Sequence, residues 1–395
     1  MSQKIAKIET FLFYPGTAKN LLLCKITTDD GVYGWGEAYV QPRKEMIPKM
    51  LIDLVAPSLV GRSVFEIRHI RDGILKDFNI KRTSIEIMSA ISGIEIAMWD
   101  IVGKYAGQPV VNLLGGPYRS AIRCYANGWW KGNPSDEELA ARAVRLKEQG
   151  WSAVKWDPFR GPWREYVSEK FIDRAVENVR VIREAVGPDM ELMVEGHRRL
   201  SPYNAIHFYD KIAQYNPSLY EEPCCSDNLD LVVQAKQGIH VPVVTGETMH
   251  SKGEFKEVFE KHAAEIINPD TCATGGISAM MEIAHMADPY AVILSPHNYN
   301  STVVGLAATV HLSAAVPNFN IAEVFVNIKP GCDSIASKNI VVKDGFAEIP
   351  TEPGLGIDID VEALEKQAFR EVSAAYNSPS VLVEYPCKED YPVLD

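Results

Sequence analysis

Three short apolar runs that each end in a glutamate read Glu191-Leu-Met-Val-Glu195, Ser218-Leu-Tyr-Glu221 and Val241-Pro-Val-Val-Thr-Gly-Glu247. The three glutamates are evenly spaced, 26 residues apart. A β-strand, its return helix and the two connecting loops take about that length. The runs therefore predict consecutive parallel strands, whose ends would bring the three carboxylates together at one edge of the sheet.

Three carboxylates that share a small space repel one another. Each pair at about 4 Å costs roughly 4 kcal/mol at an effective dielectric constant near 20. A divalent cation would offset this repulsion, and ligation by oxygen alone suits Mg²⁺. The pattern therefore predicts a magnesium site on Glu195, Glu221 and Glu247.

The rhythm of strand, loop and helix extends well beyond these three runs. Ser135 and Glu138 form a predicted capping box at the start of one helix, and Gly150 ends it. Repeated βα units favour a parallel sheet, and eight strand starts favour a closed barrel with its chemistry at the strand C-terminal ends. The eight predicted strands begin near Ile122, Ser152, Glu191, Ser218, Val241, Ala264, Ala291 and Phe319.

The residues before the barrel predict a smaller domain of strands followed by helices. The alternating stretches are Ile5–Phe13, Asn20–Thr28 and Val32–Ala38, and the helical stretch runs from about Lys44 to Lys104. We therefore expect an α/β protein with a modified TIM (β/α) barrel and an N-terminal α+β capping domain. The predicted boundaries are residues 1–118 for the capping domain, 119–350 for the catalytic barrel, and 351–395 for a C-terminal segment that returns to complete the capping domain.

Charge and composition restrict the partners of the protein. The chain has 395 residues and a formal net charge of −12, without a block of Lys and Arg. This balance argues against nucleic acid and anionic membrane surfaces as partners. No apolar stretch is long enough for a signal peptide or a bilayer span. The seven cysteines are scattered, which suits a reducing compartment. We therefore expect a soluble, cytoplasmic protein.

Every predicted strand from the second onward ends in polar residues. A single acid at such a position most often caps the next helix or is solvated, but seven endings in register indicate an active site. Besides the three glutamates, these endings provide Lys155, Asp157, His197, Glu222, Asn268, Asp270, His297, Asn298 and Glu323.

At these residues the chain resembles the enolase superfamily, and within it the mandelate-racemase-like subgroup. The resemblance includes Gly93–Lys104, the three acidic ligands and Pro353–Gly356. The Lys-Trp-Asp-Pro-Phe motif at Lys155–Phe159 is most similar to the sugar-acid (gluconate, galactonate and arabinonate) dehydratases. The resemblance implies a homo-oligomeric, Mg²⁺-dependent hydro-lyase that converts a small-molecule sugar acid (an aldonate) to a 2-keto-3-deoxy acid.

The resemblance also implies a role for each residue near the substrate. The Mg²⁺ would bind the substrate carboxylate, and the enediolate would need electrostatic stabilisation as it forms. Mg²⁺ with a Lys or His base is the arrangement already known for enolase-type sites. The implied roles are base for His297, orientation of that base for Asp270, a hydrogen bond to the enediolate for Glu323, and acid toward the β-hydroxyl for His197.

Two departures from the family pattern affect the prediction. The racemases of this subgroup carry Lys-x-Lys on the second strand, whereas here the second position is Asp157, which argues against a lysine base. The third strand is followed by His197-Arg198-Arg199 instead of His-Gly-Arg, which leaves the identity of the sugar open. Lys155 would either neutralise the substrate carboxylate or hold Asp157. The predicted substrate contacts are Glu222, Asn298, Arg199 and Trp129.

Three other functions compete with dehydration. A racemase, epimerase or cycloisomerase of a sugar acid or its lactone would use His197 and His297 as paired bases on the same fold. A retaining glycosidase would use Glu221 or Glu222 with Glu323 and needs no metal. A non-catalytic binding protein is the third. The absence of any His-x-His in the sequence disfavours a metal-dependent amidohydrolase.

Overall fold

The computed structural model describes residues 3–16, 19–78, 83–132, 134–159 and 167–371. The chain divides into two compact units. The described residues of the first unit lie within Met1–Tyr125, Gly246–Lys256 and Ile267–Glu371. Those of the second lie within Ala126–Thr245 and Glu257–Ile266. No helix in the described ranges combines the length and the apolar character needed to cross a bilayer.

The main sheet has ten strands and is mostly parallel. Its hydrogen-bonded order is β10-β9-β8-β7-β6-β5-β4-β14-β13, and β11 also pairs with β4. Leu294 of β10 forms a parallel bridge with Phe319, just before β11, so the strands β4 to β11 follow one another in a closed order typical of a TIM barrel. They are β4 (Ala121–Asn127), β5 (Ala153–Trp156), β6 (Glu191–Glu195), β7 (Leu219–Glu221), β8 (Val243–Thr245), β9 (Ile266–Ile267), β10 (Ile293–Leu294) and β11 (Ala322–Phe325).

The eight predicted barrel strands are confirmed, each beginning within three residues of its expected position. The last one begins at Ala322 instead of Phe319, because the preceding residues form only the isolated bridge to β10. The two remaining strands, β13 (Val342–Lys343) and β14 (Phe346–Glu348), form a hairpin, and β14 pairs antiparallel with β4. The tail residues up to Glu348 therefore extend the barrel sheet.

Parallel register places the first two glutamates side by side. Glu195 of β6 is the register partner of Glu221 of β7, and both are the last residues of their strands. Residues paired in this way project on the same face of the sheet. The prediction that these two carboxylates meet at one edge is confirmed.

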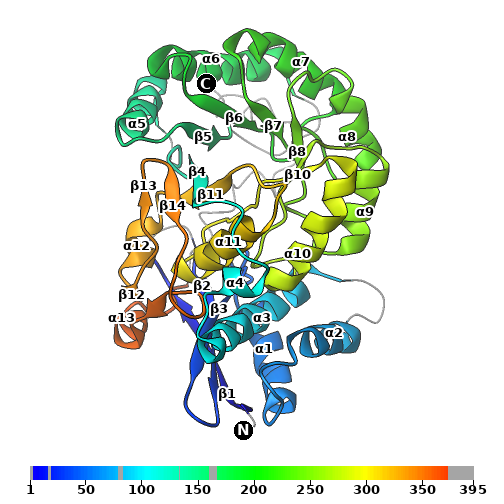
Figure 1. Cartoon of the computed structure of the whole chain (residues 1–395). Helices are drawn as coiled ribbons and strands as arrows, with labels where there is room; N and C mark the ends of the chain where they lie inside the picture. Colours follow the sequence, from blue (N-terminus) through cyan, green and yellow to red (C-terminus); the bar gives the residue numbers. More distant parts are fainter. Residues whose placement is uncertain (1–2, 17–18, 79–82, 133, 160–166, 372–395) are drawn as a thin grey trace. The chain divides into compact units, whose positions relative to one another are not determined.

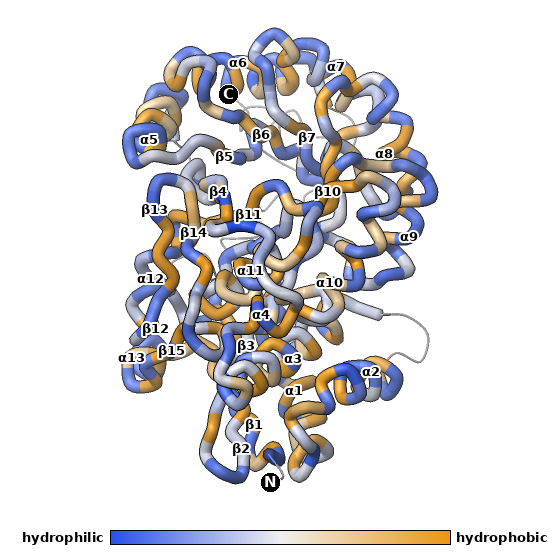
Figure 2. Tube along the Cα trace, viewed as in Figure 1, coloured by the Kyte–Doolittle hydropathy of each residue, from blue (hydrophilic) through white to orange (hydrophobic). Residues whose placement is uncertain are grey.

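Helices α5 to α8 lie outside strands β5 to β8 in the second unit (Figure 1). In α5, Ser135 and Glu138 form the predicted capping box, and Leu139, Ala143 and Leu146 are its buried residues. Hydrophobic and hydrophilic segments alternate along α5 and α6, as expected for helices with one buried face (Figure 2). The helices of the barrel are α5 (Asp136–Glu148), α6 (Glu169–Val186), α7 (Pro202–Ile212), α8 (Leu229–Lys236), α9 (Lys252–Glu260), α10 (Gly276–Ala287) and α11 (Val303–Ala315), and the last two belong to the first unit.

The N-terminal residues form a three-stranded antiparallel sheet packed on a long buried helix. The close approach of β3 to α3 requires glycine, since a Cβ at Gly36 would lie 1.9 Å from the carbonyl oxygen of Gly93. The predicted strands and helical stretch are confirmed. They form β1 (Ile5–Phe13), β2 (Leu21–Thr28), β3 (Tyr33–Ala38), α1 (Met46–Leu59), α2 (Ile67–Phe78), α3 (Ile85–Ala106) and the short α4 (Val110–Leu113).

The end of the described chain packs against these first strands. Asp358, in β15 (Asp358–Ile359), accepts hydrogen bonds from Tyr33 Oη at 2.8 Å and Trp35 Nε1 at 3.1 Å. The Arg370 amide donates to Asn20 Oδ1 at 2.9 Å. The rest of the predicted returning segment, residues 372–395, lies outside the described residues. The smaller elements of the tail are α12 (Lys329–Asp333), β12 (Ala336–Lys338) and α13 (Val361–Lys366).

Buried carboxylates join the N-terminal region to barrel helices within the first unit. Glu95 of α3 accepts hydrogen bonds from the backbone amides of Ile277 and Ser278, both at 2.8 Å, at the start of α10. Glu37 of β3 accepts from the Gly305 amide at 2.8 Å, at the start of α11. A carboxylate at these positions accepts hydrogen bonds from N–H groups of the first helical turn, which have no partner within their own helix, and its charge complements the helix dipole.

Candidate active site

One histidine of the first unit is held by an aspartate. His297 follows β10, and its Nδ1 lies 2.8 Å from Oδ2 of Asp270, which follows β9. The two residues also form a parallel β-bridge. With Nδ1 occupied by the carboxylate, the proton is held on Nδ1 and the lone pair is left on Nε2. His297 is therefore oriented to take up a proton at Nε2.

The surroundings of Nε2 are acidic. Nε2 of His297 lies 3.4 Å from Glu247 Oε2 and 3.8 Å from Glu323 Oε2. Burial alone would lower the pKa of His297, but the charge of Glu323, the hydrogen bond to Asp270 and the charge of Glu247 raise it to about 9. The nitrogen is therefore strongly basic.

Glu323 is fully buried and accepts two hydrogen bonds. The backbone amide of Asn298 donates to Oε2 at 2.9 Å, and the Tyr125 hydroxyl donates to Oε1 at 3.0 Å. The side-chain Nδ2 of Asn298 also donates to the Glu323 carbonyl at 3.3 Å. Tyr125 did not emerge from the strand-end pattern, although it stands on β4 two residues before the strand ends.

A buried lysine stands near the same histidine and was also missed. Lys19 is 1% exposed, and its ammonium lies 4.5 Å from the ring centroid of Tyr39 and 4.2 Å from that of Tyr299. The Tyr299 ring in turn stacks on the His297 ring, with centroids 5.9 Å apart and planes 14° apart. Burial lowers the pKa of Lys19 to about 8, although nearby Asp270 and Glu37 oppose that shift. Lys19 precedes a strand in the sequence and carries no motif that would single it out.

The second unit holds a matching pair of histidine and aspartate. His197 Nδ1 lies 2.8 Å from Asp157 Oδ2. The guanidinium of Arg199 donates to both oxygens of Asp157, at 3.0 and 2.9 Å. Burial alone would raise the pKa of Asp157, but the charge of Arg199 and the hydrogen bond with His197 hold it well below its usual value. Asp157 is therefore an ionised anchor for His197.

Lys155 contacts two of the predicted metal ligands. Its buried ammonium forms a short ion pair with Glu221 Oε1 and lies 3.5 Å from Glu195 Oε2. The lysine therefore neutralises part of the negative charge at these strand ends.

Trp129 and Glu222, two of the predicted substrate contacts, are buried and bonded within the protein. The indole Nε1 of Trp129 donates to the Lys155 carbonyl at 3.0 Å, and Glu222 accepts from the Thr245 hydroxyl at 2.9 Å. These bonds hold the ends of their strands, and contact with a substrate stays a prediction for both residues.

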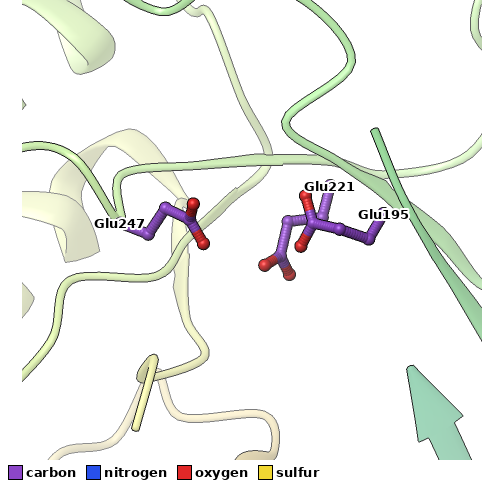
Figure 3. A group of neighbouring side chains, drawn as sticks. All are labelled: Glu195, Glu221 and Glu247. Carbon is purple, nitrogen blue, oxygen red and sulfur yellow. The ribbon is translucent and has the colours of Figure 1, made fainter. Parts of the chain in front are cut away.

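The three evenly spaced glutamates form a group that could hold a metal ion. Glu195, Glu221 and Glu247 each offer one carboxylate oxygen, and these oxygens all lie within 4.8 Å of one another. Figure 3 shows the side chains of these three glutamates. Three carboxylate ligands match the preference of Mg²⁺ for oxygen. The donor set therefore fits a hard divalent cation.

Family models match both parts of the chain. Residues 15–115 match the N-terminal domain of the mandelate racemase / muconate lactonizing enzyme family, and residues 138–364 match the enolase C-terminal domain-like family. The D-galactonate dehydratase of Ralstonia nicotianae is 32% identical over 367 residues, covering 91% of this chain and 93% of the relative. The D-gluconate/D-galactonate dehydratase of Picrophilus torridus is 30% identical over 357 residues, covering 89% of each chain.

One solved structure shows the same architecture with a different named activity. The crystal structure of the 3,6-anhydro-D-galactonate cycloisomerase from Zobellia galactanivorans superposes with a TM-score of 0.85 at 31% identity. The match covers 93% of this chain and all of the other chain. Because the match covers 93% of this chain, it includes nearly every element of the fold.

Proposed function

Because the chain belongs to the mandelate racemase / muconate lactonizing enzyme family, we propose that it is a Mg²⁺-dependent dehydratase of a sugar acid. The observation that carries the proposal is the pair of aspartate-bound histidines, His297 with Asp270 and His197 with Asp157. Dehydration needs one base and one acid, and each histidine has its Nδ1 fixed so that Nε2 is the reactive nitrogen. Curated relatives named as sugar-acid dehydratases support the substrate class.

In the proposed reaction, His297 Nε2 takes the proton from the carbon next to the substrate carboxylate. His197 gives a proton to the hydroxyl on the following carbon, which leaves as water. The resulting enol becomes a 2-keto-3-deoxy acid. Asp270 and Asp157 hold the two imidazoles in position, and Glu323 would donate a hydrogen bond to the enediolate once protonated.

The residues that would hold the cation are Glu195, Glu221 and Glu247. Bound Mg²⁺ would supply Lewis-acid polarisation of the substrate carboxylate, which makes the adjacent proton more acidic. Asn298 and Arg199 remain the proposed contacts to the substrate. Arg199 would act mainly through Asp157, because both oxygens of that carboxylate already accept from its guanidinium.

A cycloisomerase is the second candidate, and the Zobellia structure favours it. Such an enzyme would start from an anhydro sugar acid and form no water. Asp157 supports neither candidate over the other, because both use the histidine that it holds. The nature of the substrate separates them.

A screen of sugar acids with the metal-free protein tests the proposal. Each acid is incubated with and without Mg²⁺, and 2-keto acids are trapped with semicarbazide. We expect a 2-keto-3-deoxy product from at least one aldonate, only when Mg²⁺ is present. Full 2-keto acid formation in the presence of EDTA would contradict the role of the metal, and turnover of anhydro acids alone would support the cycloisomerase.

We also infer a cytoplasmic homo-oligomer, from composition and from the resemblance. Light scattering of the purified chain tests the oligomer, and a monomer at micromolar concentration would remove that part of the proposal. Fractionation of cells that produce the chain tests the location.

A further inference from the structure

Asn268 carries a buried amide with no hydrogen-bond partner. It directly follows β9 and is 1% exposed. Neither Oδ1 nor Nδ2 has a partner among the residues that the structure describes. In most buried side-chain amides the oxygen or the nitrogen makes at least one hydrogen bond, since burying a polar group without a hydrogen bond is unfavourable. An asparagine with both atoms unsatisfied therefore calls for a functional account.

The position of this amide points to the proposed metal centre. Gly246 has a φ of +135°, and a Cβ built on it would lie 3.3 Å from Asn268 Oδ1. Gly246 is the residue directly before Glu247. The side chain of Asn268 is thus packed against the backbone that carries one predicted metal ligand.

The segment that carries Asn268 also carries Asp270, the residue that holds the proposed base. Asn268 and Asp270 are two positions apart in the segment that follows β9. Asp270 holds His297, whose Nε2 lies 3.4 Å from Glu247 Oε2. Asn268 therefore belongs to the segment that carries Asp270, and it packs against Gly246, the residue directly before Glu247.

We propose that Asn268 is a positioning residue of the metal centre, whose unpartnered amide donates a hydrogen bond to the Glu247 carboxylate once the cation is bound. The inference rests on the proposed function, because it requires a cation on the three glutamates. Groups that bond to metal ligands from behind restrict their orientation, and their loss typically costs 10–100-fold in metal affinity. A neutral amide suits this role because it can donate to a carboxylate without adding charge.

The substitution Asn268→Leu separates this role from a purely structural one. Leucine has a similar volume and no polar atom, so the metal-free variant should be as stable as the wild type or more stable. Its Kd for Mg²⁺, measured by isothermal titration calorimetry on the full metal-free chain, should rise by about 10–100-fold. Urea unfolding of the metal-free proteins gives the stability. A variant with unchanged stability and wild-type Kd would overturn the proposal.

Ser313→Ala is the matched control. Ser313 is also fully buried, and its hydroxyl likewise has no partner in the described ranges. It lies near the end of α11, roughly 15 Å along the helix from the strand-end side. This variant should bind Mg²⁺ with wild-type affinity, and an equal loss of affinity in both variants would contradict a specific role for Asn268.

Two outcomes keep the proposals apart. If Asn268→Leu does not fold, Asn268→Ala removes the same amide without the added methyl groups, and the same rise in Kd is expected. If the wild-type chain itself binds no Mg²⁺, the proposed function fails together with this inference. If the wild type binds Mg²⁺ and both Asn268 variants match it, only the role of Asn268 is wrong.

Discussion

His197 Nδ1 lies 2.8 Å from Asp157 Oδ2, and the same distance separates His297 Nδ1 from Asp270 Oδ2. The two pairs differ in one respect. Each aspartate accepts the backbone amide two residues further on at 2.8 Å, from Phe159 for Asp157 and from Cys272 for Asp270, but Asp157 also receives the bidentate guanidinium of Arg199. The aspartate that takes the position of a racemase lysine is therefore an anchor for the proposed acid.

The substitution Asp157→Asn should impair both folding and catalysis. It removes the buried ion pair between Asp157 and Arg199, which should cost about 3–5 kcal/mol of the free energy of unfolding. The folded fraction should show a lower kcat, because an amide does not fix the His197 tautomer, with a smaller change in KM. Urea unfolding and steady-state kinetics measure the two effects. Asp157→Glu keeps the charge and should recover part of kcat, and a wild-type kcat in Asp157→Asn would contradict the anchoring role.

The two histidines should be separable by isotope exchange in D₂O. His297→Asn should lose both dehydration and exchange of the proton next to the carboxylate, by about 10²–10⁴-fold. His197→Asn should lose dehydration to a similar extent but keep exchange, because the base is intact. NMR of recovered substrate measures the deuterium, and mass spectrometry measures the keto acid. Exchange that survives in His297→Asn would assign the base elsewhere.

His311 should make the protein less stable in mild acid. Burial lowers its pKa to about 4, and its Nε2 bonds to the Leu355 carbonyl at 3.1 Å. The ordinary pKa is about 6.5, so between these values the unfolded chain binds the proton and the folded one does not. This contribution to stability is complete above pH 6.5 and falls by about 1.4 kcal/mol per unit toward pH 4. In His311→Gln the free energy of unfolding should depend less on pH over this range, and an unchanged slope would contradict the prediction.

Glu95→Gln should destabilise the fold without touching the metal site. The Glu95 carboxylate accepts hydrogen bonds from two backbone amides of α10 and from the Trp99 indole. The side-chain NH₂ group of glutamine would face at least one of these N–H groups and could not accept a hydrogen bond from it. We expect a loss of about 1.5–3 kcal/mol in the free energy of unfolding, with an unchanged Kd for Mg²⁺. Glu86→Gln, on the first turn of the same helix, is the control and should cost at most about 1 kcal/mol. Equal losses would show that the contacts of Glu95 with α10 are unimportant.

Sequence reasoning succeeded where the signal is local. The strand starts follow from short apolar runs between helices with caps such as Ser135, and the grouping of the three glutamates follows from their even spacing. It missed Lys19, Tyr125 and Tyr299, because an aromatic residue or a lone lysine beside a strand is common and indicates no particular chemistry. Glu95 had a usable signal, since a charge inside a helix that is apolar nearly all round must find a buried partner.

The amino-acid sequence by itself determined which residues end the barrel strands, because alternation and spacing depend only on near neighbours in the chain. The tertiary structure decided which partner each of those residues takes. Lys155 contacts Glu221 and Glu195, whereas Asp157 binds His197 and Arg199. Two residues at the end of the same strand therefore have entirely different partners. Such pairings join residues about 40 to 66 positions apart. They depend on the register between strands and on burial, which no local pattern records.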